Sequence, residues 1–205
     1  MNPVFTVGHS THPSPFLLDL LRRHGVTAVA DVRSQPYSRM NPQFNRETLR
    51  AALKHVGIAY VFMGEELGAR SGDPDCYHEG KVQYDRLGRT PSFSKAIARL
   101  TDGSATHRIA LLCAEKDPLT CHRTILIARH VAAAGLTVQH ILADGKLEPH
   151  DAANSRLLRE VGLPEDELFR SREQLLDEAY RRREREIAFV DPKLSPVRSV
   201  LEHAR

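Results

Sequence analysis

Tryptophan is absent from this sequence of 205 residues, and cysteine occurs only three times. Three cysteines cannot form the disulfide framework of a small secreted domain, so they are expected to be free thiols, metal ligands or nucleophiles. Long apolar runs are missing as well. The longest uninterrupted one, residues 109–114, is far short of the roughly 20 residues that a transmembrane helix requires. The sequence therefore excludes the disulfide-rich and membrane-spanning classes of protein.

An excess of charge of one sign is also missing. The sequence has 29 Lys and Arg residues and 26 Asp and Glu residues, which gives a net charge of only +3. This excess is too weak to be the electrostatic footprint of a DNA-binding protein. Residues 1–10 contain no basic segment followed by a long apolar one, so no secretory signal is predicted and a cytoplasmic location is expected. The hydrophobic content of 41% and charged content of 27% are those of an ordinary globular protein.

Short apolar runs alternate with helical patterns along the first two-thirds of the chain. This alternation is typical of an α/β fold with a mostly parallel, open, Rossmann-like sheet, flanked by helices and joined by right-handed crossovers. The apolar run at 108–113 suits the centre of such a sheet. Strands are predicted at 4–7, 27–32, 58–62, 108–113 and 137–142, and helices at 13–24, 46–55, 91–100 and 120–134.

The end of the chain has a different pattern. Two helical stretches, 151–161 and 165–187, follow one another without a strand between them. We therefore expect an α/β core domain over 1–145 and a helical C-terminal extension over 146–205, packed on the core or projecting from it. The run 181–186 in this extension is dense in charge, and its interleaved glutamates favour a solvated helix with ion pairs along one face. A nucleic-acid-binding arm is the alternative.

Polar residues follow three of the predicted strands at the point where each strand ends. Ligands of open parallel sheets bind at the carboxyl ends of the strands, so these side chains meet in one crevice if the three strands are neighbours. The residues are His9 and Ser10 after the first strand, Asp31 and Arg33 at the end of the second, and Cys113 and Glu115 after the central one.

The loop after the central strand combines sulfur, carboxylate and cationic groups. Thr120 is expected to cap the helix that begins there, which places Cys121 in the first helical turn. Unpaired backbone N–H groups and the positive end of the helix dipole favour a thiolate at that position. Arg123 adds a planar cation suited to phosphate or carboxylate. The loop is therefore predicted to offer an anion site beside a candidate nucleophile.

Each of these residues also has a structural interpretation. Cys113 can be a small buried apolar residue, Arg123 can pair with a neighbouring carboxylate, and the histidines can be satisfied parts of the core. Cys76 lies in an irregular segment and is expected to have no role. Zinc binding is a further alternative, although the spacing of eight positions between the second and third cysteines is unlike a zinc ribbon. Its ligands would come from Cys113, Cys121, His122 and His9.

Six short motifs occur in one order along the chain. They are Val7-Gly8-His9-Ser10, Asp31-Val32-Arg33, Gly57-Ile58-Ala59-Tyr60, Glu66-Leu67-Gly68, Leu112-Cys113-Ala114-Glu115 and Cys121-His122-Arg123. Together they resemble the domain of unknown function family DUF488, over roughly residues 4–142. Leu67-Gly68-Ala69 stands where members typically have Leu-Gly-Gly. The resemblance implies a compact α/β domain and two notable cysteines that suggest enzymatic activity, matched here by Cys113 and Cys121, and it implies no substrate.

The leading hypothesis from the sequence is a cysteine-dependent hydrolase or transferase that binds an anionic, phosphate-bearing or nucleotide substrate at the strand ends. Cys121 would be the nucleophile and Cys113 its partner, with His9 as general acid or base and Glu115 as an orienting carboxylate. The expected substrate-binding residues are Ser10, Asp31, Arg33, His122 and Arg123. No cofactor is expected, and the oligomeric state is left open.

A second hypothesis, from a different class, is a non-catalytic module that binds nucleic acid or a nucleotide. It would use the basic helix near the end of the chain together with Arg33, Arg39, Arg46 and Arg70, and the cysteines would be structural. Binding of this kind depends steeply on salt concentration, because phosphate contacts release counterions.

Overall fold

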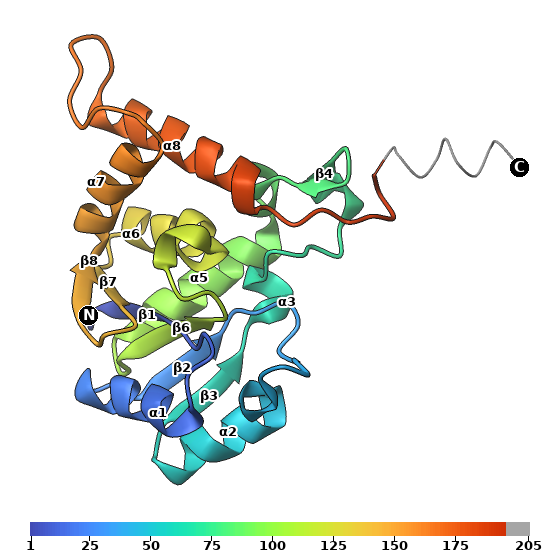
Figure 1. Ribbon diagram of the computed structural model, residues 1–205, viewed down its shortest axis with the longest axis vertical. Helices are drawn as coiled ribbons and strands as arrows, with labels where there is room; N and C mark the ends of the chain where they lie inside the picture. Colours follow the sequence, from blue (N-terminus) through green and yellow to red (C-terminus); the bar gives the residue numbers. More distant parts are fainter. Residues whose placement is uncertain (196–205) are drawn as a thin grey trace, which may run out of the picture.

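A six-stranded sheet forms the centre of the protein (Figure 1). The computed structural model describes residues 1–195, so the end of the predicted extension, 196–205, lies outside the described residues. The strand order is β3-β2-β6-β1-β7-β8; β8 runs antiparallel to β7 at one edge, and the other neighbours are parallel. The strands are β1 (Val4–Gly8), β2 (Ala28–Asp31), β3 (Ala59–Phe62), β6 (Ile109–Cys113), β7 (Val138–Ile141) and β8 (Leu147–Pro149). The expected α/β fold with a mostly parallel open sheet is confirmed.

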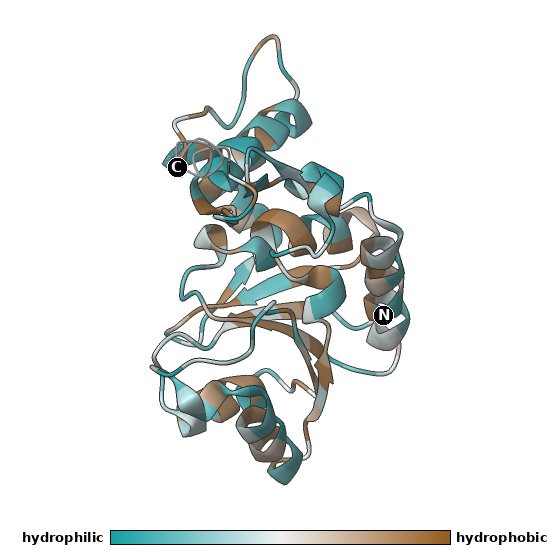
Figure 2. Cartoon of the chain, turned by 90° about the vertical axis from the view of Figure 1, so that its right-hand side faces the viewer, coloured by the Kyte–Doolittle hydropathy of each residue, from teal (hydrophilic) through white to brown (hydrophobic). Residues whose placement is uncertain are grey.

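Helices cover both faces of the sheet, and each face has its own apolar core (Figure 2). Helices α1 (Ser14–Arg23) and α2 (Arg46–His55) pack on one face, where Leu17 and Leu49 are fully buried. The core of the other face includes residues from α5 to α8. Among residues 1–195, no helix has the length and apolarity needed to cross a bilayer. The remaining helices are α3 (Gly64–Leu67), α4 (Tyr84–Leu87), α5 (Pro91–Ser104), α6 (Arg129–Ala133), α7 (His150–Glu160) and α8 (Arg172–Ile187).

Strand β6 lies between β2 and β1 and is buried along its whole length. Successive side chains of a strand point to opposite faces, so alternate residues join different cores. Ala110 and Leu112 join the core under α1 and α2, whereas Leu111 and Cys113 join the core under α5 to α8. This alternation fixes the direction of the Cys113 thiol, which faces the side that the C-terminal helices cover.

The helix predicted over 120–134 is broken into three pieces. A 3-10 turn (Pro118–Thr120) is followed by an extended residue, Cys121, then by a π-helical segment (Arg123–Ala128) and by α6. The prediction that Thr120 is the cap is wrong: its hydroxyl donates to the Asp117 carbonyl, and Cys121 Sγ accepts from Arg123 N–H at 3.4 Å. All six residues of the π-helical segment are buried, so the amino-acid pattern has no amphipathic period that could reveal the break.

Two boundaries in the C-terminal part also differ from the prediction. Strand β8 was not predicted, because a three-residue edge strand is too short to show an alternating pattern. Helix α8 begins at Arg172 rather than at residue 165. Its start is set by a capping box in which Ser171 Oγ accepts from Gln174 N–H and the Gln174 side chain accepts from Ser171 N–H.

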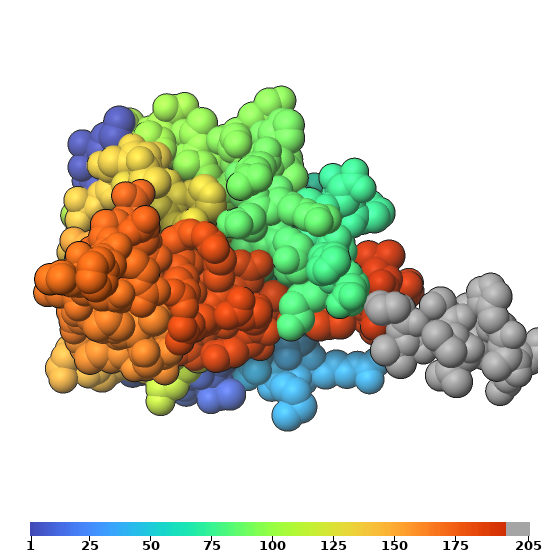
Figure 3. Space-filling model, turned by 90° about the horizontal axis from the view of Figure 1, so that it is seen from above, coloured from blue at the N-terminus to red at the C-terminus, as the bar shows by residue number. Residues whose placement is uncertain are grey.

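Helix α8 and the segment after it lie beside the short hairpin β4 (Tyr77–His78) and β5 (Lys81–Val82) (Figures 1 and 3). Leu175 and Ala179 of α8 are fully buried in the core of the sheet's second face. Beyond α8, the Val82 N–H donates to the Phe189 carbonyl, and Asp191 N–H donates to the Gly80 carbonyl. The C-terminal helices therefore share the core of the sheet, and the domain division at residue 145 stays a prediction.

Candidate functional site

Four side chains meet at the carboxyl end of β6: Cys113, Glu115, Cys121 and His122. One atom from each, two sulfurs, an imidazole nitrogen and a carboxylate oxygen, lies within 4.8 Å of the others. His122 Nδ1 is 3.6 Å from Cys113 Sγ and 3.8 Å from Cys121 Sγ, and Glu115 Oε2 is 2.8 Å from Cys121 Sγ. We call these four residues the Cys/His/Glu cluster. It lines a cavity of about 270 Å³.

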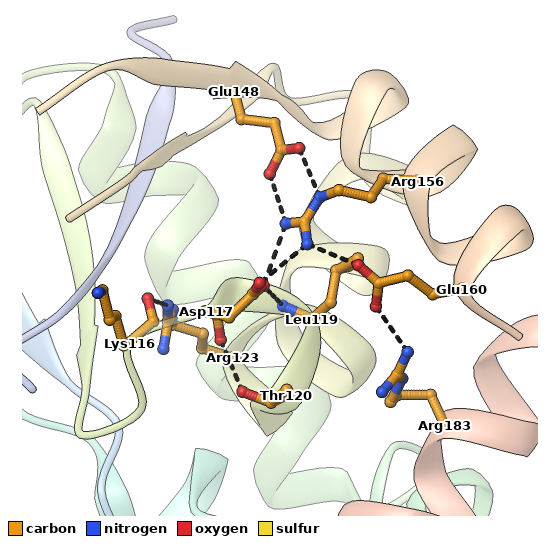
Figure 4. A network of polar contacts seen from close by, with 9 residues as sticks. All are labelled: Lys116, Asp117, Leu119, Thr120, Arg123, Glu148, Arg156, Glu160 and Arg183. Atoms are coloured by element: carbon orange, nitrogen blue, oxygen red, sulfur yellow. Dashed lines mark hydrogen bonds and ion pairs between the residues drawn. The ribbon is translucent and has the colours of Figure 1, made fainter. Parts of the chain in front are cut away.

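Local structure explains why a strand and the following loop bring these four residues together. Cys113 is the last residue of β6, and the chain returns through the 3-10 turn to Cys121. Asp117 starts this turn by accepting a hydrogen bond from Leu119 N–H at 2.8 Å. Asp117 is held in turn by Arg156 of α7, whose guanidinium also pairs with Glu148 and Glu160 (Figure 4). The loop that carries Glu115 and Cys121 is thus anchored to the C-terminal helices.

Arg123 also holds the loop that carries Glu115 and Cys121. Its side chain is fully buried, and its guanidinium donates to the Glu115 carbonyl at 2.7 Å and to the Lys116 carbonyl at 3.3 Å. Within residues 1–195, no carboxylate lies at ion-pair distance from this guanidinium. A buried cation requires compensation, and its charge favours the thiolate form of Cys121 by lowering the pKa of that thiol. Arg123 therefore fixes the loop and balances charge, and it is turned toward backbone rather than toward the cavity.

The acid–base properties of the cluster follow from burial and from mutual contact. Burial raises the pKa of the Cys113 thiol well above its usual range. Burial acts in the same sense on Cys121, but the Cys113 thiol and the positive charge of Arg123 outweigh it and hold the pKa of Cys121 well below its usual range. Burial lowers the pKa of His122, yet the Cys121 thiolate outweighs it, and the pKa of His122 is raised. Desolvation and Cys121 raise the pKa of Glu115.

A second polar group lies at the ends of β1 and β2. Arg33 pairs with Asp31 through Nη2 to Oδ2 at 2.6 Å and Nε to Oδ1 at 2.8 Å, and both residues are buried. The Tyr60 hydroxyl donates to Asp31 at 2.7 Å, and His9 Nε2 lies 3.2 Å from Arg33 Nη1. Burial lowers the pKa of His9 to about 4, so His9 is neutral and stacks on Phe44. Asp31 and His9 are therefore engaged by Arg33.

The structure divides the residues expected at the site into two sets. Those that line the cavity are Arg33, Cys113, Glu115, Cys121 and His122. Those that do not line it are His9, Ser10, Asp31 and Arg123. Ser10 N–H donates to the Ala114 carbonyl, and its backbone is in the left-handed region with φ 48°. The cavity set is the one that a small ligand can contact.

Other residues lining the cavity were not predicted to belong to this site. Arg70 was considered only for nucleic-acid binding; its guanidinium lies 4.4 Å from the centre of the Phe189 ring and donates to Gln35 Oε1 at 2.9 Å. Gly68 marks the close approach of this segment to the loop after β2, because a Cβ there would lie 2.4 Å from Ser34 Oγ. Gly68 belongs to the motif Glu66-Leu67-Gly68, and a glycine in a motif is the signal from which the close approach to Ser34 could have been inferred.

These features define a class of protein: an α/β domain with a sulfur, imidazole and carboxylate cluster at the carboxyl edge of its parallel sheet. The model of the family Domain of unknown function DUF488 matches residues 15–130, more than half of the chain, and the protein belongs to this family. The matched region contains the whole Cys/His/Glu cluster and ends before α7, α8 and Phe189. No curated protein and no solved structure is significantly similar to the chain.

Proposed function

We propose that the protein is an enzyme that hydrolyses or transfers a group of a small anionic substrate, with the reaction taking place at the Cys/His/Glu cluster. One observation carries this proposal: four chemically reactive side chains converge on a cavity at the sheet edge where open α/β folds bind their ligands. A volume of about 270 Å³ is just below the range of about 300–1,000 Å³ that is usual for small-molecule sites, which favours a very small substrate or one end of a larger one.

Glu115 is the proton-transfer group of the proposed reaction. The residue is exposed at the mouth of the cavity, and its carboxylate turns inward to within 2.8 Å of Cys121 Sγ. A carboxylate in this position reaches both the cluster and a substrate that enters from solvent.

Arg70 is the group that recognises the anionic part of the substrate. It is exposed, lines the cavity, and forms no ion pair within residues 1–195. A planar guanidinium offers paired donors to a phosphate or carboxylate. Arg33 also lines the cavity, but its charge is already compensated by Asp31, so Arg70 is the stronger candidate.

A covalent route is the second candidate: the Cys121 thiolate attacks the electrophilic atom of the substrate and displaces its leaving group, and water or an acceptor then takes the group from the sulfur as the thiolate departs. The observation that favours it is geometric: Cys121 is among the residues that line the cavity, and its sulfur accepts a hydrogen bond from Arg123 N–H at the start of the π-helical segment. The nucleic-acid alternative receives no comparable support. Arg181, Arg182 and Arg183 of α8 each pair with an acidic residue, so this part of the helix presents no row of free cations.

The proposal is tested with two chromogenic probes, p-nitrophenyl phosphate and p-nitrophenyl acetate, and with alkylation of Cys121 by iodoacetamide in the presence and absence of inorganic phosphate. Glu115→Gln is expected to lower kcat by about 10²–10⁴-fold, the range for a general acid or base. Arg70→Ala is expected to raise KM and to abolish protection by phosphate, while Arg89→Ala, an exposed arginine outside the cavity, leaves both unchanged. Absence of turnover together with absence of protection would overturn the proposal.

A further inference from the structure

The distances within the Cys/His/Glu cluster match those between the ligands of one metal ion. A tetrahedral zinc ion has Zn–S bonds of about 2.3 Å and Zn–N bonds of about 2.0–2.1 Å, which separates a sulfur from a nitrogen ligand by about 3.5 Å. His122 Nδ1 lies 3.6 Å from Cys113 Sγ and 3.8 Å from Cys121 Sγ. We propose that Cys113, Cys121 and His122 bind a divalent zinc-type ion, which leaves a fourth position open toward the cavity and Glu115.

The outer contacts of His122 suit a metal ligand. Its Nε2 lies 3.0 Å from the carbonyl oxygen of Val32 and donates a hydrogen bond to it. This contact assigns one proton to Nε2, so a neutral imidazole has its Nδ1 lone pair directed at the two sulfurs. Metal-binding histidines usually donate their second ring nitrogen to a carbonyl or carboxylate, which fixes the tautomer and the orientation of the ring. The ring of His122 is therefore already oriented for coordination.

The surroundings of the two sulfurs also suit an ion. Arg123 N–H donates to Cys121 Sγ at 3.4 Å, so a coordinated thiolate keeps a backbone donor. Two thiolates neutralise a divalent ion, so the bound ion adds no net charge to the buried surroundings of Arg123. A metal ion bound to Cys121 replaces the thiol proton that is donated to Glu115 Oε2, so this carboxylate becomes free to act on a ligand in the fourth position.

The ligands proposed here differ from the zinc ligands that the sequence suggested. His9 is not part of it, because its Nε2 faces the Arg33 guanidinium and its Nδ1 faces the Ser10 carbonyl. Three protein ligands and an open position are typical of a catalytic rather than a structural zinc site. A catalytic role of the ion therefore rests on the proposed function. Binding of the ion does not, because it requires no substrate.

The test uses the full chain, freed of metal with a chelator under reducing conditions and then titrated with Zn²⁺ against a chromophoric chelator. Wild type and Glu115→Gln are expected to bind one equivalent. Cys121→Ser and His122→Gln are expected to weaken binding by more than about 100-fold, beyond the range for loss of an outer partner. Cys76→Ser is the matched control, since this buried cysteine lies outside the cluster, and it is expected to bind one equivalent. Far-UV circular dichroism checks that each variant is folded.

A second measurement replaces zinc with Co²⁺ in the metal-free chain. A site with two thiolates is expected to give sulfur-to-cobalt charge-transfer absorption, which Cys113→Ser reduces and Cys76→Ser preserves. The proposal is overturned if the wild-type chain binds less than one equivalent of Zn²⁺, or if Cys121→Ser and His122→Gln bind as tightly as Cys76→Ser. Failure of the proposed function appears separately, as loss of turnover and phosphate protection in a chain that still binds zinc.

Discussion

The substitution Gly8→Ala tests whether the Cys/His/Glu cluster depends on close contact between the end of β1 and the loop after β6. Gly8 is the last residue of β1 and lies opposite Cys113 in the parallel ladder. A Cβ at this position would lie 1.8 Å from the Glu115 carbonyl oxygen, 2.8 Å from its carbon and 3.3 Å from Arg123 Nη1. Gly8→Ala therefore cannot be accommodated by a side-chain rotation, because the obstacle is the backbone of the loop.

The cost can be worked from these contacts. Ordinary van der Waals contact begins near 3.4 Å, so the Glu115 carbonyl must retreat by about 1.6 Å, a large shift for a close-packed interior. Overpacking costs about 1–3 kcal/mol, and each hydrogen bond lost between Arg123 and the loop adds about 0.5–1.5 kcal/mol. Removing a glycine from a strand returns about 0.5–1 kcal/mol. We expect Gly8→Ala to lower the free energy of unfolding by about 2–4 kcal/mol.

Urea unfolding followed by circular dichroism measures this change, and the zinc titration reports on the cluster. Gly72→Ala is the matched control, because no atom lies within 4 Å of a Cβ built there; its free energy of unfolding is expected to change by less than about 1 kcal/mol. Gly8→Ala should bind zinc more weakly, since the displaced loop carries Cys121. A variant that keeps wild-type stability and one tightly bound zinc would refute the packing argument.

Three further predictions concern buried ionisable side chains. Asp31→Asn leaves the buried Arg33 guanidinium without its charged partner and is expected to lower the free energy of unfolding by about 3–5 kcal/mol; an unchanged urea midpoint would contradict this. Arg123→Met removes a donor from the Glu115 carbonyl, so faster amide hydrogen exchange is expected in this loop, with a loss of about 1–3 kcal/mol. Burial lowers the pKa of His150 to about 4 from 6.5, so the unfolded chain binds the proton first as pH falls. Stability should therefore decrease from pH 6.5 to 4, by at most about 1.4 kcal/mol per pKa unit, and His150→Gln should flatten that dependence in urea unfolding at pH 7 and 5.

Local patterns were sufficient to predict the alternation of strands and helices. The predicted helix at 46–55 coincides with α2, and the apolar run at 108–113 became the buried strand β6. These predictions succeed because amphipathic period and burial are properties of neighbouring residues. The π-helical break at Arg123–Ala128 and the edge strand β8 were not predicted, since a uniformly buried stretch and a three-residue strand have no measurable period.

The sequence by itself determined that thiols, a carboxylate and a histidine follow the central strand, and it predicted a site at the strand ends. Only the tertiary structure decided which of these groups meet. The order of strands and the alternation along β6 turn Cys113 toward Cys121 and His122, whereas His9 and Asp31 are held by Arg33. Phe189 and Arg70 reach the cavity through contacts between segments far apart in the chain. Residue spacing encodes local conformation, but convergence depends on long-range packing, which no local pattern records.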